Sequence, residues 1–413
     1  MPPQIDLPLH RLDRVPVLLV GGVSLVRCLG LAGIPAVVAS HDMGEPAFGS
    51  RYCVGRCLLP PPDQPEAAVD ALVRIGDRLT AKYGRRVPLM YGSDDYLELI
   101  HANRDRLERY FLVLLNDAEV ADALLVKDRF QEFAESRGLP VPRSLAWEGL
   151  AESSGPVLVK PSNKVDWHDS LLRRTLFHHG KALIFASGAQ AAAEENVALF
   201  REQLTFQEYI PGDDSCIWSY HGFADGQGGV LDYFIGRKLR TFPTRTGESS
   251  FIELTFDKDL EGLGARIAAE IGLKGVFKMD FKRDPGTGRW YLLEINARFN
   301  LWHYLGAANG VNLLRTAYDY LLDGSRPEIP GDYGVGLRWI SLDLDVRAFR
   351  ELYARGELGL FSWLSSLCSP KVYNLFAWRD PGPWIRFWAF RLVRRWYRSG
   401  LLSLVRQWRS TAS

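Results

Sequence analysis

Residues 275–300 read GVFKMDFKRDPGTGRWYLLEINARFN, two alternating apolar and polar runs on either side of the turn sequence Asp-Pro-Gly-Thr-Gly. Successive side chains of a strand point to opposite faces, so the pattern predicts a β-hairpin with one apolar face and one polar face. The apolar face takes Phe277, Met279, Phe281, Leu293, Ile295 and Ala297. The polar face takes Lys278, Asp280, Lys282, Glu294, Asn296 and Arg298.

The length of the turn decides which polar residues meet. A three-residue loop with Gly288 in the left-handed conformation pairs Pro285 with Arg289 and sets Asp280 opposite Glu294. A four-residue loop would set Asp280 opposite an apolar residue instead. Two opposed carboxylates repel unless a cation lies between them, and a nearby amide oxygen completes a set of hard ligands suited to Mg²⁺. The alternative is an exposed hairpin with scattered polar residues, and spacing alone does not decide between the two.

Asp280, followed by Glu294-x-Asn296-x-Arg298, resembles the metal-binding signature of the ATP-grasp superfamily. The resemblance implies ATP as cofactor and a metal site of Asp280, Glu294 and Asn296 for Mg²⁺, with Mn²⁺ as the alternative ion. It implies an α/β (α+β) fold in three parts: a Rossmann-like pre-ATP-grasp domain at 1–120, an ATP-grasp domain of two subdomains at 121–328 with a hinge near 207–212, and a helical C-terminal extension at 329–413.

The N-terminal part has a β-α-β pattern, with strands expected at 15–20 and 36–39. The glycines that follow the first strand do not form G-x-G-x-x-G, which argues against dinucleotide binding. Ser93 and Asp94 follow a later apolar run at 87–91, and the carboxyl ends of parallel strands are where open α/β sheets bind ligands. Both are therefore candidate substrate-binding residues, although Ser or Asp at the start of a helix is more often only an N-cap.

Lysines in the second part are candidate phosphate ligands. Lys160 ends an apolar strand directly before a proline, an unusual place for a lysine unless it meets a buried anion. The resemblance implies that Lys127 and Lys160 contact ATP phosphates. The glycine-rich loop that the family usually has next is missing, and Ser162, Asn163 and Lys164 are left to act through their side chains.

Residues 206–214 resemble the hinge that holds the adenine through backbone groups and the ribose through a nearby acid. The residues implied in ATP binding are Gln207, Glu208, Tyr209, Ile210, Asp213 and Asp214; a strand ending in a Pro-Gly turn is the alternative. Three cations at Arg237, Lys238 and Arg240 indicate an anion site, with surface solvation as the alternative. We expect Arg237 to bind substrate, and Lys238 and Arg240 to take part in the chemistry with Arg298.

Composition excludes several classes of protein. The 413 residues include 50 Lys and Arg against 49 Asp and Glu, which gives no sign of nucleic-acid binding. The five cysteines form no C-x-x-C pair, which argues against a disulfide framework and a structural zinc site. No apolar run has the roughly 18 residues of a membrane span. A reducing cytoplasm is the expected location, with contact at the inner face of a membrane as an addition discussed below.

The resemblance is to the carboxylate-amine ligase type of ATP-grasp enzyme. It implies that a substrate carboxylate attacks the γ-phosphate of ATP and that an amine displaces phosphate from the acyl phosphate, leaving an amide, ADP and phosphate. The expected partners are a small carboxylate and an amine, such as an amino acid or an envelope precursor, and a homodimer is a further expectation. The alternatives are an ATP-grasp enzyme with a non-amine acceptor and a protein that only binds nucleotide.

The C-terminal segment at 383–409 is rich in arginine, tryptophan and phenylalanine and has no acidic residue. A helix here would place many of its arginines on one side and aromatic and aliphatic residues on the other. One interpretation is an amphipathic helix at an anionic membrane surface. The alternative is that the aromatic residues pack on the body of the protein or in a dimer.

Overall fold

The computed structural model describes residues 5–8, 10–125, 127–162, 171–177, 180–327 and 333–395; the side chains of residues 127 and 128 lie outside this description. The chain forms two compact units, Met1–Val113 with Leu375–Ser413, and Leu114–Asn374. These boundaries differ from the three parts expected, because the C-terminal part does not form a unit of its own. Residues 338–340 extend the main sheet of the second unit, whereas residues after 375 join the first unit.

The first unit contains a six-stranded sheet in the order β1-β4-β3-β2-β5-β6. Its strands are β1 (Ile5–Asp6), β2 (Val17–Val20), β3 (Ala36–Ser40), β4 (Cys53–Leu58), β5 (Val87–Tyr91) and β6 (Phe111–Leu112). Its helices are α1 (Val23–Leu31), α2 (Pro65–Tyr83), α3 (Asp94–Ala102) and α4 (Arg104–Leu107), with the 3₁₀ turn η1 (Pro46–Gly49). All pairings are parallel except that of β1 with β4, which confirms the expected Rossmann-like arrangement.

After β2, the chain adds β3 and β4 on one side of it and then β5 and β6 on the other side. The strand order therefore reverses between β2 and β5. The expected strands at 15–20, 36–39 and 87–91 are thus confirmed as β2, β3 and β5.

Residues after 375 belong to the first unit because of a buried ion pair. Asp380 Oδ2 lies 3.0 Å from Arg27 Nε, and both side chains are 1% exposed. Ser50 Oγ donates to the same carboxylate at 2.9 Å. A helix follows over residues 382–395.

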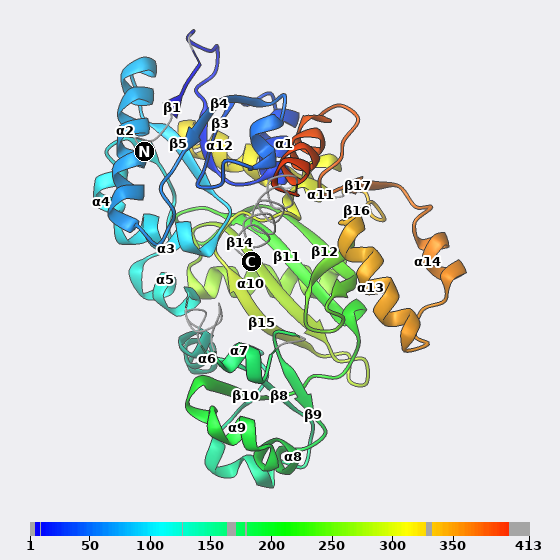
Figure 1. Cartoon of the computed structure of the whole chain (residues 1–413). Coiled ribbons are helices and arrows are strands. Elements are labelled where there is room, and N and C mark those ends of the chain that lie inside the picture. The colour runs from blue at the N-terminus through cyan, green and yellow to red at the C-terminus, as the bar shows by residue number, and fades with distance from the viewer. Residues whose placement is uncertain are drawn as a thin grey trace, which may run out of the picture. The chain divides into compact units, whose positions relative to one another are not determined.

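The second unit is built on a seven-stranded sheet in the order β15-β14-β11-β12-β13-β16-β17 (Figure 1). The strands are β11 (Ile217–Ala224), β12 (Val230–Phe242), β13 (Glu248–Thr255), β14 (Gly275–Arg283), β15 (Trp290–Asn296), β16 (Arg338–Ile340) and β17 (Lys371–Tyr373). One face packs its apolar residues, among them Phe277, Met279 and Phe281, against helix α10 (Lys258–Ile271). Asp257 caps the start of α10 through a bond to Leu260 N. The opposite face carries Asp280, and we call it the polar face.

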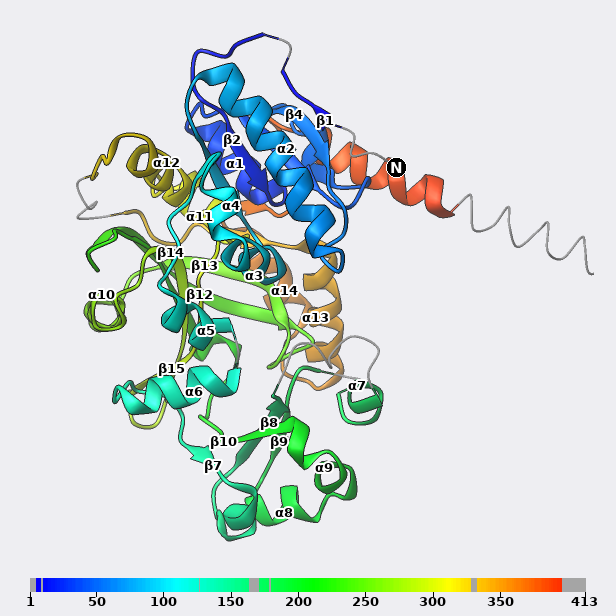
Figure 2. The same cartoon turned by 90° about the vertical axis from the view of Figure 1, so that its left-hand side faces the viewer.

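The second unit also contains a smaller sheet, in the order β7-β10-β8-β9. Its strands are β7 (Ser144–Leu145), β8 (Val157–Pro161), β9 (Leu183–Phe185) and β10 (Leu204–Glu208). One face packs with α8 (Gly188–Ala193) and α9 (Glu195–Leu199) in a separate apolar core (Figure 2). Because side chains alternate along β8 and β10, Lys160 and Gln207 lie on the other face, away from this core.

The remaining helices of the second unit are α5 (Ala118–Leu125), α6 (Lys127–Ser136), α7 (Leu171–Thr175), α11 (His303–Ala308), α12 (Leu313–Asp323), α13 (Leu342–Ala354) and α14 (Leu360–Ser366). Its 3₁₀ turns are η2 (Trp147–Glu152), η3 (Arg201–Gln203) and η4 (Asp214–Cys216). Within the described part of the chain, every helix is too short or too polar to cross a membrane.

Candidate active site

The turn between β14 and β15 is the four-residue loop, the longer of the two alternatives considered from the sequence. Gly288 has the expected left-handed conformation, with φ of 72°. The pair that closes the loop is Asp284 with Arg289, whose backbone N–H and carbonyl bond at 2.9 Å, and not Pro285 with Arg289. A ladder counted back from this turn would place Asp280 opposite the wrong residue.

A β-bulge at Leu293 restores the pairing. Phe281 lies opposite Leu292, but the register shifts at the next step and Asp280 lies opposite Glu294. The predicted juxtaposition of the two carboxylates is therefore confirmed, although the route to it is different. The expected place of Leu293 on the apolar face is corrected: Leu293 is only half-buried, and Leu292 lies in the core instead, with no exposed area.

Asp280 is buried between two donors on the polar face. Ser219 Oγ donates to its Oδ1 from β11, and Lys278 Nζ lies 2.6 Å from its Oδ2. Burial raises the pKa of Asp280, but the positive charges of Lys278 and Lys238 outweigh that effect and hold the pKa well below its usual value. Asp280 is therefore ionised in the folded protein at neutral pH.

Lys238 faces the same group from β12. It is one same-face step beyond Gly236, which lies opposite Ser219. Burial lowers the pKa of Lys238, while the charges of Asp280 and Glu294 oppose that shift. Lys238 thus lies in the field of the two carboxylates, as expected for a residue that balances charge at this site.

Lys282 extends the row of polar residues on β14 toward the smaller sheet. It is 8% exposed, and its Nζ lies 4.4 Å from the centroid of the Tyr209 ring. Burial lowers the pKa of Lys282, an effect opposed by Cys216 and Asp214. The Lys282 side chain therefore contacts Tyr209 from the polar face.

Glu294 and Asn296 complete the donor set. Asn296 Nδ2 donates to Glu294 Oε1 at 3.0 Å, which orients both side chains on the polar face. The described residues contain no group of three or more His, Cys, Asp and Glu that could hold a metal, because the third donor here is an amide. Two opposed carboxylates and an amide oxygen are hard ligands, so their chemistry fits Mg²⁺.

Arg298 lies beyond the end of β15 and is half-buried. The segment after it is held by His221 and His303, both fully buried, which contact Asn300 through their ring nitrogens at 3.4 and 3.3 Å. Burial, followed by the charges of Lys278 and Arg298, lowers the pKa of His303 to about 3. Both histidines are therefore neutral supports and do not add to the charge of the site.

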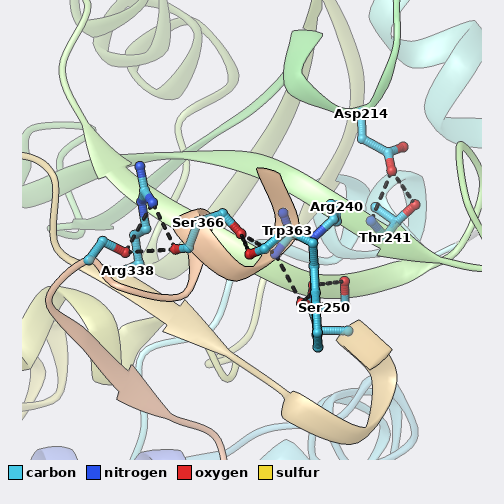
Figure 3. Close-up of polar contacts among 9 residues, drawn as sticks. Asp214, Arg240, Thr241, Ser250, Arg338, Trp363 and Ser366 are labelled. Atoms are coloured by element: carbon cyan, nitrogen blue, oxygen red, sulfur yellow. Dashed lines mark hydrogen bonds and ion pairs between the residues drawn. The ribbon is translucent and has the colours of Figure 1, made fainter. Parts of the chain in front are cut away.

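Arg240 does not belong to this site, contrary to our expectation. The register of β12 with β13 shifts between Lys238 and Arg240, so Arg240 lies on the face opposite Asp280. Its guanidinium binds Asp345 of α13 at 2.7 and 2.9 Å. It also contacts Ser366 Oγ at 3.1 Å (Figure 3). The prediction of a catalytic role for Arg240 is corrected, because its charge is neutralised in a structural ion pair.

Arg237 also faces away from Asp280. It pairs across the sheet with Glu253, with a distance of 2.8 Å between Arg237 Nη2 and Glu253 Oε2, and its guanidinium lies over the Trp218 ring. Glu253 also accepts from Arg338 at 2.9 Å. The expected role of Arg237 in binding substrate beside Lys238 is therefore not supported, since neighbouring residues of a strand point to opposite faces.

Most side chains of residues 207–210, which we expect to form the hinge, already have hydrogen-bond or packing partners. Gln207 is buried and donates to Gln131 of α6. Glu208 Oε1 accepts from Arg143 N at 2.9 Å, and Tyr209 N donates to Pro156 O at 2.9 Å. Ile210 is buried. If this segment binds adenine, it does so through backbone groups, and its side chains set the shape.

Asp213 and Asp214 differ in their surroundings. Asp213 caps η4 and accepts from Ser215 N and Oγ at 2.9 and 2.7 Å. Asp214 is buried and accepts two bonds of 2.8 Å from Thr241 through its Oδ2, whereas its Oδ1 has no partner within the described chain (Figure 3). Burial raises the pKa of Asp214, an effect that the Thr241 bonds oppose.

The remaining expected ligands are located less completely. Lys160 is half-buried on the side of β8 away from the small core, and its contact with phosphate stays a prediction. The Ser162 hydroxyl oxygen lies 3.4 Å from Thr205 Oγ1. α6 begins at Lys127, but the Lys127 side chain and residues 163–164 lie outside the described residues.

Ser93 and Asp94 lie in the first unit, at the end of β5. Ser93 Oγ accepts from Tyr96 N at 3.4 Å and caps α3, and Asp94 is the first residue of that helix. The capping alternative thus accounts for Ser93, and their roles in substrate binding stay predictions.

Sequence reasoning passed over Lys278, Ser219 and Lys282 as site residues. Lys278 and Lys282 could have been found, because both share the alternating face of β14 with Asp280. Ser219 had no such signal, because it reaches Asp280 only through the pairing of β11 with β14.

The main sheet carries opposed acidic residues on one face, is joined to a smaller sheet by residues 209–216 and is preceded in the chain by a Rossmann-like unit. This is the arrangement of the ATP-grasp fold. The chain has this fold. Solved structures agree: it matches N5-carboxyaminoimidazole synthetase from Staphylococcus aureus complexed with ADP with a TM-score of 0.56 and 12% identity, over 80% of this chain and 82% of that chain. It matches L-amino acid ligase from Bacillus licheniformis with a TM-score of 0.52 and 17% identity, over 76% and 75% of the two chains.

Among characterised proteins, the chain is similar to D-aspartate ligase from Enterococcus faecium (strain Aus0004). The two are 25% identical over an alignment of 274 positions that covers 62% of this chain and 64% of that enzyme. The chain therefore aligns with less than two thirds of that relative. No family model matches the chain.

Proposed function

We propose that this protein is an ATP-dependent carboxylate-amine ligase that forms an amide or peptide bond through an acyl phosphate. The observation that carries the proposal is the pairing of Asp280 with Glu294 on the polar face, beside Asn296 and the cations Lys278 and Lys238. Two directly opposed carboxylates repel each other, so their pairing favours a bound cation, and the neighbouring lysines offer positive charge to an anion such as phosphate.

Asp280, Glu294 and Asn296 would hold Mg²⁺, with Mn²⁺ as a second candidate. When bound, the ion neutralises charge on the ATP phosphates. The protein supplies no covalent nucleophile in this chemistry, so its contribution is to position the reactants and to offset charge.

In the first step, a substrate carboxylate oxygen attacks the γ-phosphorus of ATP and ADP leaves. In the second step, the amine nitrogen attacks the acyl carbon, phosphate leaves with the bonding electrons, and the nitrogen loses a proton. Lys127, Lys160, Lys238 and Lys278 would balance the phosphate charge. Arg298 would stabilise the acyl phosphate and the oxyanion that forms on its carbonyl.

The substrates follow by analogy with the relatives. The D-aspartate ligase similarity makes D-aspartate the first carboxylate to test, and other amino acids and envelope precursors come next. Use of ATP accords with the expected cytoplasmic location. The expected membrane contact through 383–409 and the expected homodimer are separate proposals on which the ligase activity does not depend.

The test is ADP release from the full chain with ATP, Mg²⁺ and a panel of carboxylic acids, each with and without amines. Hydroxylamine replaces the amine in a second series, because it converts an acyl phosphate to a stable hydroxamate. ADP release that requires one acid, together with its hydroxamate, supports the ligase. ADP release without hydroxamate favours a non-amine acceptor, and ATP binding without any ADP release favours a nucleotide-binding protein without activity.

A further inference from the structure

The helix at residues 382–395 has one face that packs on the first unit. This face carries Pro383, Arg386, Phe387 and Phe390, which are buried or half-buried. Arg386 donates through Nε to Glu45 O at 3.0 Å and also binds Met43 O, and its guanidinium lies over the Phe48 ring. The packing alternative is thus correct for this face, and the helix has a fixed seat on its own unit.

The other side of the same helix leaves large apolar residues in solvent. Trp384 and Trp388 are each 43% exposed, and Leu392 is 64% exposed. Trp378, just before the helix, is 89% exposed. We call Trp378, Trp384, Ile385, Trp388, Leu392 and Val393 the tail patch, and all of them are exposed. Isolated apolar residues at a surface are ordinary, but several exposed together on one helix and the segment before it, three of them tryptophans, indicate a binding surface.

Arginines border the tail patch. Arg391, Arg394 and Arg395 are all exposed, and the Arg391 guanidinium lies over the Trp388 ring at 5.5 Å. Arg394 has one acidic neighbour, Asp42, at 3.6 Å. The sequence has no acidic residue after Asp380, so these charges are not balanced by the segment itself.

The charge decides which occupant fits this surface. A symmetric contact between two copies of the helix would bring the arginines of one copy near those of the other, with no acid in the segment to compensate. An anionic bilayer has the complementary charge and an apolar layer below it. Tryptophan prefers the boundary between these layers, and arginine binds lipid phosphate while its stem lies along apolar surface.

We propose that the tail patch docks the protein on an anionic lipid bilayer, with its tryptophans at the headgroup boundary and Arg391 and Arg395 on lipid phosphates. The inward face keeps the helix on the first unit, so docking needs no unfolding of the helix. The proposal does not depend on the ligase activity.

The test is co-sedimentation of the full chain with vesicles of phosphatidylglycerol mixed with phosphatidylcholine, and with vesicles of phosphatidylcholine alone. Point variants are preferable to truncation, because Pro383 and Phe387 are part of the fold. We expect binding to the anionic vesicles that weakens with added salt. The triple variant Trp384→Ser, Trp388→Ser, Leu392→Ser should bind about tenfold more weakly or worse. Arg391→Gln with Arg395→Gln should lose most of the preference for anionic lipid.

Matched controls lie in the second unit. Phe361→Ser removes an aromatic side chain that is 86% exposed on α14, and Arg173→Gln with Arg174→Gln removes two exposed charges on α7. These variants should sediment like the unaltered chain, and ADP release without vesicles should be the same for all. No sedimentation of the unaltered chain, or equal loss in the controls, would overturn the proposal. A dimer in solution that the triple variant dissociates, without vesicle binding, would assign the patch to a second copy.

Discussion

Arg240 and Asp345 form a buried ion pair that joins β12 to α13 through two hydrogen bonds, at 2.7 and 2.9 Å. Asp345 has no exposed area and also accepts from Ser250 Oγ at 3.2 Å and Trp363 Nε1 at 2.9 Å. Four donor atoms therefore contact the carboxylate, so its oxygens are satisfied without hydrogen bonds to water. The pair is part of what attaches the chain after residue 333 to the main sheet.

Asp345→Ala should therefore destabilise the second unit by about 3–5 kcal/mol, because it leaves the Arg240 charge buried without a partner. Urea unfolding followed by circular dichroism measures the effect. The double variant Arg240→Met, Asp345→Leu should recover much of the loss, since it removes both charges. Glu119→Ala is the control: it breaks the exposed pair with Arg137, in which Glu119 is 79% exposed, and should cost less than about 1 kcal/mol. Equal losses in Asp345→Ala and the control would contradict the assigned role.

Glu294→Gln should abolish ADP release while the protein stays folded. The change keeps the size of the side chain but removes one of the two charges that face a bound cation. Differential scanning fluorimetry with ATP should show a stabilisation that depends on Mg²⁺ in the unaltered chain and is much smaller in the variant. Glu202→Gln, at a side chain that is 87% exposed, serves as the control and should behave like the unaltered chain. Full activity of Glu294→Gln would remove the metal assignment.

Arg298→Lys should lower the turnover rate and leave ATP affinity nearly unchanged. Arg298 lies beyond Asn296 at the end of β15, where a flat guanidinium can contact two oxygens at once and an ammonium cannot. Turnover at saturating ATP and nucleotide binding by calorimetry separate the two effects. Weakened ATP binding with unchanged turnover would instead place Arg298 among the nucleotide ligands.

The sequence predicts an element correctly where the pattern that indicates it is local. Alternation located β14 and the polar face around Asp280, and apolar runs located β2, β3 and β5. The failures come from single inserted residues. One extra residue between Lys238 and Arg240 moves Arg240 to the opposite face, and nothing in the local composition marks this bulge.

Long-range pairs were also invisible in the sequence. Arg27 and Asp380 are separated by 353 positions, and their contact decides that the C-terminal helix belongs to the first unit. In the hairpin, two departures from the three-residue-loop prediction cancel. The loop has four residues, but the bulge at Leu293 still sets Asp280 opposite Glu294.

Asp232 gives a prediction about pH. It is 6% exposed, accepts from Thr316 Oγ1 at 2.7 Å through Oδ2, and its Oδ1 has no partner among the described residues. Burial raises the pKa of Asp232 to about 6, an effect that the Thr316 bond opposes. Between the unfolded pKa of about 4 and this value, the folded state binds a proton that the unfolded state does not, so the free energy of unfolding falls as pH rises through that window.

Asp232→Asn removes this titration and keeps an acceptor for Thr316. The variant should therefore gain stability relative to the unaltered chain as pH rises from about 4 to above 6, by up to roughly 3 kcal/mol. Burial lowers the pKa of His303 to about 3 and that of His221 well below its usual value, which destabilises the fold as pH falls below their unfolded pKa of about 6.5. Both histidines are present in both proteins, so the difference between melting temperatures isolates Asp232. Asp77→Asn, at an exposed position, controls for the substitution itself; a constant difference for Asp232→Asn across the pH range would show that Asp232 is ionised in the folded protein throughout.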